Sequence, residues 1–216
     1  MKCAIVPVTP FQQNCSVIWS ETTKEGAVVD PGGDPERVLA AVETHDVRLT
    51  KILITHGHVD HAAATADLAE ALSLPIEGPH KADKFWIDAL PEAAARYGFP
   101  PARAFTPDRW LVGGDTVTLG DLTLDVIHCP GHTPGHVVFL HRPSRLALVG
   151  DVLFQGSIGR TDFPQGDHEA LIRSIRDRLF PLGDDIVFVP GHGPTSTFGA
   201  ERRSNPYVSD LAVGAA

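Results

Sequence analysis

The sequence predicts an α/β fold, with two or four layers, in which helices cover β-sheet. Short apolar runs rich in β-branched residues occur in series, and segments of helix-forming residues separate them. The 216 residues are 43% hydrophobic, which supplies a core without disulfides. The length and the lack of an obvious linker indicate one domain spanning residues 1–216.

The first third of the chain alternates extended and helical signals. Asp34 is a natural N-cap residue and Pro35 a natural first-turn residue, so a helix is expected to about His45. Good helix formers dominate residues 62–71, which predicts a second helix. The strands predicted here are apolar runs that cover residues 2–8, 15–19, 26–30 and 51–55.

The rest of the chain continues this alternation. Residues 80–97 have a helical composition interrupted at Pro91, and the prolines and aromatics of residues 98–109 predict a long surface loop. A further helix is expected from about Asp167 to Leu179. The strands predicted in this part cover residues 115–119, 122–128, 136–141, 146–150 and 185–189.

The charge balance argues against nucleic-acid and membrane partners. Eighteen Lys and Arg against 27 Asp and Glu give a formal net charge of -9, and no basic stripe could neutralise phosphates. No apolar run is long enough for a membrane span. The N-terminal segment lacks the pattern of a secretory signal, so we expect a cytoplasmic protein.

The cysteines give no sign of a disulfide framework or a thiolate zinc site. They are an odd number, Cys3, Cys15 and Cys129, and form no C-x-x-C pair. We expect them to be small buried hydrophobic residues.

A run of potential metal ligands follows the predicted strand 51–55. His56, His58, Asp60 and His61 are these ligands. An extended segment would project positions 56, 58 and 60 to one side, while positions 60 and 61 would begin the next helix. Imidazole and carboxylate ligands without thiolate suit zinc, iron or manganese. The segment could therefore serve two metal ions, and the ligand set leaves their identity open.

Three further candidates follow later apolar strands, each directly after a glycine: His132, Asp151 and His192. A glycine beside a ligand allows a sharp turn, and strand ends place loops at one edge of a sheet. The joint pattern is much harder to explain by chance than any single histidine.

The H-x-H-x-D-H motif of residues 56–61 resembles that of the metallo-β-lactamase superfamily, and the three later candidates match its remaining metal-binding positions in order. The resemblance covers essentially the whole chain and implies a four-layered αββα sandwich (the metallo-β-lactamase fold) with a dinuclear site at one edge. By this resemblance one ion would be held by His56, His58 and His132, the other by Asp60, His61 and His192, with Asp151 bridging them.

The cofactors implied are two divalent metal ions, with zinc expected first and iron or manganese as alternatives. Two such ions carry more positive charge than Asp60 and Asp151 return, which favours a bridging hydroxide. Metal binding lowers the pKa of water to about 7, so a nucleophile is available near neutral pH. No protein nucleophile is then needed, and the chain has no G-x-S-x-G motif.

Within the superfamily the chain resembles the glyoxalase II (hydroxyacylglutathione hydrolase) group, in its short bacterial form without a C-terminal helical domain. The stretches that carry this resemblance are residues 151–154 with 159–163, the helix start near 166–167, and residues 195–206.

This second resemblance implies two substrate-binding residues, Arg160, which would meet a carboxylate of glutathione, and Phe163, at an aromatic position of the family. A guanidinium can hold a carboxylate with two hydrogen bonds, but an ordinary ion pair is the alternative for Arg160. We expect no counterpart here of the further basic residues with which the family holds glutathione. Arg202 and Arg203 are not their equivalents and are expected on a solvated helix face. Looser glutathione recognition, or another acyl thioester, therefore stays open.

The reaction implied is hydrolysis of a 2-hydroxyacyl thioester such as S-lactoylglutathione by a metal-bridging hydroxide. Asp60 would orient that hydroxide and one ion would stabilise the oxyanion. A thiol leaving group with a pKa near 8.5 needs little help from an acid, and the motifs contain no obvious one.

The main alternative is an oxidoreductase. Persulfide dioxygenases share the fold and have a stretch similar to residues 159–163, but they use one iron. By this resemblance the present chain would hold that iron with His56, His132 and Asp151 only. A metal-bound scaffold without catalysis is a third hypothesis. The ligand set does not exclude β-lactam hydrolysis.

Two neighbours of the motifs have two roles open to them. Asp30, at the end of the predicted strand 26–30, could orient a ligand histidine or cap a turn. His136 continues directly into the strand that follows it, so we expect it to pack, or to support a ligand, rather than to bind metal.

Overall fold

The computed structural model describes residues 1–214, with side chains described through residue 212. Its first sheet has five strands in the order β1-β2-β3-β4-β5. These are β1 (Lys2–Val8), β2 (Gln13–Trp19), β3 (Glu25–Val29), β4 (Arg48–Leu53) and β5 (Ile76–Glu77). The first three strands pair antiparallel, whereas β4 pairs parallel with both β3 and β5, so crossover segments connect them.

The second sheet has six strands in the order β13-β12-β9-β8-β7-β6. These are β6 (Thr116–Leu119), β7 (Leu122–His128), β8 (Val137–His141), β9 (Leu146–Gly150), β12 (Val187–Pro190) and β13 (Ser196–Thr197). A separate hairpin pairs β10 (Leu153–Phe154) with β11 (Ser157–Ile158).

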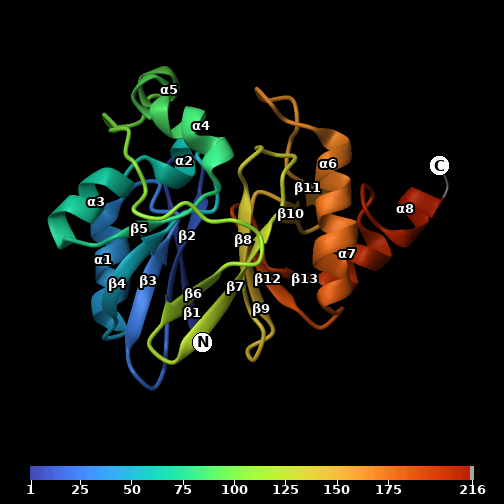
Figure 1. Cartoon of the computed structure of the whole chain (residues 1–216), viewed down its shortest axis with the longest axis horizontal. Helices are drawn as coiled ribbons and strands as arrows, with labels where there is room; N and C mark the ends of the chain where they lie inside the picture. The colour runs from blue at the N-terminus through green and yellow to red at the C-terminus, as the bar shows by residue number, and fades with distance from the viewer. Residues whose placement is uncertain (215–216) are drawn as a thin grey trace.

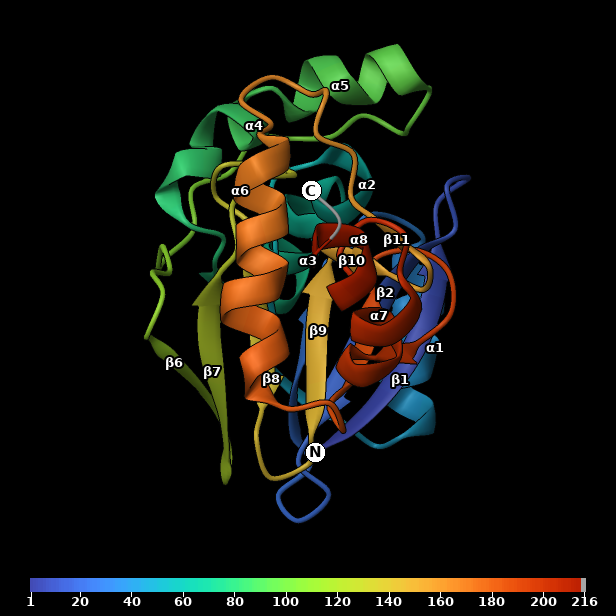
Figure 2. The same cartoon turned by 90° about the vertical axis from the view of Figure 1, so that its right-hand side faces the viewer.

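Helices cover the outer faces of both sheets (Figures 1 and 2). Outside the first sheet lie α1 (Pro35–Thr44) and α3 (Thr65–Leu72). Outside the second lie α6 (His168–Arg173) with its continuations η2 (Ser174–Leu179) and η3 (Phe180–Leu182), α7 (Phe198–Ser204) and α8 (Asp210–Gly214). At one edge lie α2 (Val59–Ala62), η1 (Lys81–Asp83), α4 (Lys84–Asp88) and α5 (Leu90–Tyr97). Within residues 1–214, no helix combines the length and apolarity needed to cross a membrane.

Alternate residues of the strands pack on opposite sides of each sheet. Ile18 and Phe139 meet in the core between the two sheets. Val17 instead packs in the cluster that contains Val38 of α1, and Val138 packs with residues of the helices outside the second sheet. The inner strands β3, β8 and β9 are thus buried on both faces, which accounts for their continuous apolar runs, whereas the outer strand β6 alternates buried and exposed residues. The layers are helix, sheet, sheet, helix, and the expected αββα sandwich is confirmed.

The helix expected after Asp34 is confirmed, but the Asp34 side chain does not form the expected capping hydrogen bond. Asp34 occupies the N-cap position of α1, but its backbone is left-handed, with φ 46°, and its side chain caps no helix N–H. One of its carboxylate oxygens instead accepts a hydrogen bond from the backbone N–H of Thr9, at 2.8 Å. Asp34 therefore ties the start of α1 to the β1–β2 hairpin.

Two expected helical regions divide differently in the structure. The helix expected over 62–71 is part of two helices, α2 and α3, because Ala64 donates its N–H to the carbonyl of Pro31 rather than within a helix. Pro91 does not interrupt the helical region over 80–97. It lies in the first turn of α5, where its missing N–H costs nothing, and the helices separate at Ala89.

Candidate metal centre

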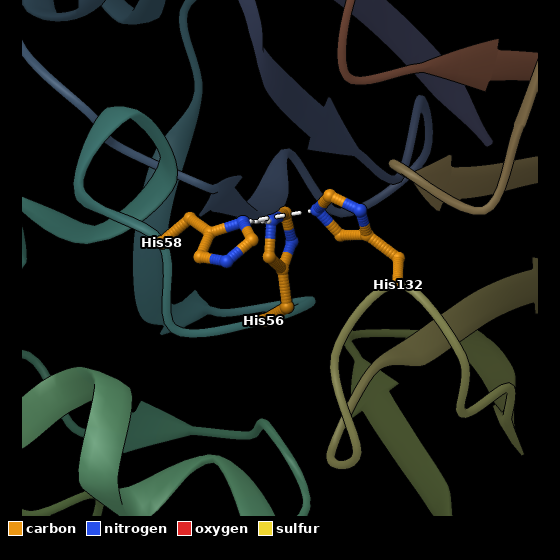
Figure 3. A group of neighbouring side chains, drawn as sticks. All are labelled: His56, His58 and His132. Atoms are coloured by element: carbon orange, nitrogen blue, oxygen red, sulfur yellow. Dashed lines mark hydrogen bonds between the residues drawn. The ribbon is translucent and has the colours of Figure 1, made fainter. Parts of the chain in front are cut away.

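Three histidines from the two halves of the sandwich point ring nitrogens toward one another (Figure 3). His56 and His58 lie on the segment between β4 and α2, and His132 lies on the loop between β7 and β8. Nδ1 of His58 lies 3.1 Å from Nε2 of His56 and 2.9 Å from Nε2 of His132. The three nitrogens can fill three positions of a tetrahedral metal site, and we call these residues the three-histidine group.

The outer nitrogens of two of these rings are already held by oxygen atoms. Nδ1 of His132 lies 2.8 Å from the carbonyl oxygen of Arg160, which can only accept, so the proton sits on Nδ1. Nδ1 of His56 lies 3.1 Å from Oγ1 of Thr55, whose own proton goes to Asp30. Both rings therefore turn an Nε2 lone pair toward His58.

Asp60, His61 and His192 form a second group, which we call the carboxylate group. Asp60 and His61 belong to α2, and His192 follows β12. Oδ2 of Asp60 lies 3.1 Å from Nε2 of His192 and 3.8 Å from Nε2 of His61. Asp60 projects from the first turn of a helix, which corrects the expectation that an extended segment carries it to the same side as His56 and His58.

Asp151, at the end of β9, lies between the two groups. Its Oδ1 is 3.3 Å from Nε2 of His61, and its Oδ2 is 3.7 Å from Nε2 of both His132 and His192. The preceding Gly150 has φ 49°, and a Cβ there would lie 2.6 Å from Nε2 of His136. Glycine is therefore required for the turn that delivers Asp151.

Asp30 and His136 support these side chains from outside both groups. One Asp30 oxygen accepts hydrogen bonds from Nδ1 of His61 at 2.9 Å and Oγ1 of Thr55 at 2.6 Å, and the other accepts from the backbone N–H of Thr55. His136 accepts the backbone N–H of Asp151 on its Nε2 at 3.0 Å. Both residues orient candidate ligands, so the supporting role is the one their contacts favour.

The electrostatics divide the two groups. Burial, reinforced by neighbouring histidines, lowers the pKa of His56 and His58 well below the ordinary value, and burial also lowers the pKa of His132. These rings are neutral at pH 7. Burial would also lower the pKa of His61, but Asp151 and Asp60 outweigh it and raise that pKa well above its usual value. Burial would raise the pKa of Asp151, yet the neighbouring His61 lowers it.

The atoms at the centre of both groups fit divalent metal ions. Nε2 of His61 and Oδ1 of Asp151 are buried and face each other at 3.3 Å, but neither forms a hydrogen bond among the described residues. In the three-histidine group, two lone pairs face Nδ1 of His58, and one proton there could satisfy only one of them. Buried polar atoms without partners are costly, and a cation between them would remove that cost.

An open pocket of about 510 Å³ leads to both groups. Its wall is rich in aromatic side chains, from segments far apart in the sequence: Phe11, Trp86, Tyr97, Phe154 and Phe163. Trp86 and Phe163 lie against the ring of His58, with centroids 4.5 and 4.8 Å away. A substrate here would meet apolar walls on its way to the ligands.

Both predicted substrate-binding residues line this pocket, and Arg160 is the only Lys or Arg among the described lining residues. Its guanidinium lies 4.3 Å from the ring centroid of Phe163 and donates two hydrogen bonds of 2.7 Å to Asp162. Arg160 therefore both faces the pocket and forms the ion pair that was its alternative role.

Sequence reasoning missed much of the pocket and its supports. Trp86 and Tyr97 line the pocket but fall in no recognisable motif. Phe154 belongs to the stretch 151–154 but had no predicted role, and the β10–β11 hairpin is too short to leave a periodic pattern. Arg202, expected on a solvated face, is half-buried, pairs with Asp184 and lies over the ring of Phe180. The three cysteines are free as expected, with Cys15 and Cys129 buried and Cys3 partly so.

The model of one protein family, described as the metallo-beta-lactamase superfamily, matches residues 8–192. The chain belongs to the metallo-beta-lactamase superfamily. One relative, the hydroxyacylglutathione hydrolase GloC of Haemophilus influenzae, is 48% identical over 210 residues, which cover 97% of this chain and 99% of the relative.

Two solved structures are similar to this chain over nearly their whole length. The B3 metallo-beta-lactamase BLEG-1 is 34% identical with a TM-score of 0.88 and covers 96% of this chain and 99% of its own. TTHA1623, solved in a di-iron-bound form, is 37% identical with a TM-score of 0.85. The match covers 94% of this chain and 99% of TTHA1623. Together with the relative above, these similarities support a hydrolase with a metal site formed by histidine and aspartate.

Proposed function

We propose that the chain is a dinuclear metal hydrolase of 2-hydroxyacyl thioesters such as S-lactoylglutathione. The observation that carries this proposal is the position of Asp151 between two groups of ligands at the base of one pocket. The similarity to a hydroxyacylglutathione hydrolase over nearly the whole chain supports the choice of substrate. The partner proposed is thus a small thioester, with glutathione as its thiol carrier.

In this proposal the two groups divide the ligands between two ions. The three-histidine group would hold one ion, the carboxylate group the other, and Asp151 would contact both. Zinc is expected first, and iron or manganese suit the same donors. Bound divalent ions would lower the pKa of water and polarise the thioester carbonyl.

The chain's own residues would prepare the substrate for attack. Asp60, which lies at the pocket surface, would orient the attacking water through its carboxylate. Trp86 and Phe163 would exclude bulk water beside His58, and Arg160 would hold a carboxylate of the carrier. The thiolate leaves without an acid because its pKa lies near 8.5.

Arg160 and Asp162 make this substrate assignment testable. We expect Arg160→Met to raise KM for S-lactoylglutathione about 10-fold or more with little change in kcat, since a hydrogen bond to a charged group contributes about 1.5–3 kcal/mol. Asp162→Asn should lower that KM up to about fivefold, because Asp162 competes for the same guanidinium through an exposed ion pair. Steady-state kinetics on both variants measure these shifts.

A thioester of N-acetylcysteamine, which carries no carboxylate, is the control substrate. Its KM should be the same in wild type and in both variants. Equal KM shifts on the two substrates would show that Arg160 acts on the pocket in general and not on a carboxylate.

The proposed reaction itself is tested by following S-lactoylglutathione at the thioester absorbance, beside oxygen uptake with glutathione persulfide. We expect loss of the thioester and no oxygen uptake. Oxygen uptake without thioester loss would replace the proposal by the persulfide dioxygenase.

A further inference from the structure

We propose that Asp83 is a positioning residue that fixes the two loops of the three-histidine group relative to each other. The inference rests on the proposed metal centre and adds a residue that belongs to neither group of ligands. Asp83 ends η1 and directly precedes α4, which carries Trp86.

The Asp83 carboxylate accepts hydrogen bonds from both loops that carry the three histidines. Its Oδ2 accepts the N–H of Gly57, which stands between His56 and His58, at 3.0 Å. The same oxygen accepts the hydroxyl of Thr133, the residue after His132, at 2.8 Å. Its Oδ1 accepts the N–H of Gly135 at 2.5 Å. A single side chain therefore accepts hydrogen bonds from the loop after β4 in the first sheet and from the β7–β8 loop of the second sheet.

These contacts are inaccessible to water, which makes them strong and costly to break. Asp83 is 0% exposed, and a carboxylate accepts from all three donors where an amide would turn an N–H₂ toward at least one of them. Burial raises the pKa of Asp83 to about 6, while the three donors act to lower it, so the side chain is charged at pH 7.

The backbone packs too closely around Asp83 for either loop to shift easily. A Cβ on Gly135 would lie 2.6 Å from Oδ1 of Asp83, and a Cβ on Gly57 would lie 2.7 Å from Cβ of Trp86. The Asp83 carboxylate therefore sets the spacing of the two loops that carry the three histidines. In this arrangement Nε2 of His56 and Nε2 of His132 lie 3.1 and 2.9 Å from Nδ1 of His58.

Asp60, His61 and His192, which form the carboxylate group, make no hydrogen bond with Asp83. His61 is oriented by Asp30, and Nδ1 of His192 lies 3.2 Å from the carbonyl of Phe11. Loss of the Asp83 carboxylate should therefore weaken one ion site and spare the other. A merely structural role would lower stability without this selectivity.

The test is a zinc titration of the metal-free protein against a chromophoric chelator, which yields two dissociation constants. Anomalous diffraction from crystals with limiting zinc assigns each constant to its site. In Asp83→Asn we expect the constant of the three-histidine site to rise about 10–100-fold, the usual effect of removing a support of a ligand. The other constant should stay within about threefold.

Two further variants separate positioning from stability. Thr133→Val removes one donor, should fold where Asp83→Asn fails, and should raise the same constant by a smaller factor. The matched control is Glu201→Gln, since Glu201 is a buried carboxylate with three donors, from Gly156, Ser196 and Asn205. This variant should lower the unfolding temperature and leave both constants unchanged.

Three results would overturn the inference: an unchanged three-histidine constant in the folded variants, equal weakening of both sites, or the same selective loss in Glu201→Gln. A wild-type protein that binds no zinc, iron or manganese would instead remove the proposed metal centre itself, and this inference with it. Because the titration measures binding alone, a failure of thioester hydrolysis leaves its outcome readable.

Discussion

Replacing His58 with alanine is expected to lower thioester turnover by more than about 100-fold. Losing a residue that only supports a metal ligand reduces activity by up to about 100-fold, and losing a ligand itself should cost more. Nδ1 of His58 is the atom toward which Nε2 of His56 and of His132 both point, so its loss removes the centre of the three-histidine group. Bound metal should fall from about two ions to about one per chain. Elemental analysis and kinetics on one preparation measure both effects.

His168→Ala is the matched control for that variant. His168 is an exposed histidine at the start of α6 and lies outside both groups of ligands. It should keep the activity and the metal content of the wild type. A His58→Ala variant that also kept both would refute the assignment of His58 as a ligand.

Asp151→Asn is expected to weaken both ion sites and to reduce turnover by a similar or larger factor. The carboxylate lies within 3.3–3.7 Å of nitrogens from both groups, and asparagine cannot supply its negative charge. Both zinc dissociation constants should therefore rise, in contrast to the selective loss expected for Asp83→Asn. The same chelator titration distinguishes the two patterns.

The control for Asp151→Asn is Asp185→Asn, which removes an exposed carboxylate paired with Arg145. That variant should bind zinc as the wild type does. If Asp151→Asn weakened only one constant, Asp151 would be a ligand of one ion and not a bridge between two.

The candidate ligands could be predicted from the sequence because each comes directly after an apolar strand or forms part of a compact motif. The strand ends do meet at one edge, and His56, His58 and His132 converge there. The layering was harder to predict, because a continuous apolar strand indicates that both faces of a sheet are covered but not whether a helix or a second sheet covers each face. The resemblance to a known family made that choice, and the two sheets confirm it.

The supporting role of Asp83 could not be predicted, because it depends on contacts between distant segments. Asp83 reaches Gly57 across 26 positions and Gly135 across 52, and it lies beside a helix too short to show a period. Asp30 could be named as a candidate but not assigned, since a turn cap and a support for His61 need the same residue type. The single domain and the cytoplasmic location stay predictions.

The number of metal ions per chain tests the central claim most directly. Metal-free protein is titrated with zinc, iron or manganese, and hydrolysis of S-lactoylglutathione is measured at each point. We predict that activity reaches its maximum at about two ions per chain, because the three-histidine group and the carboxylate group must both be filled. Saturation of binding at one ion per chain, with full activity, would contradict a dinuclear centre.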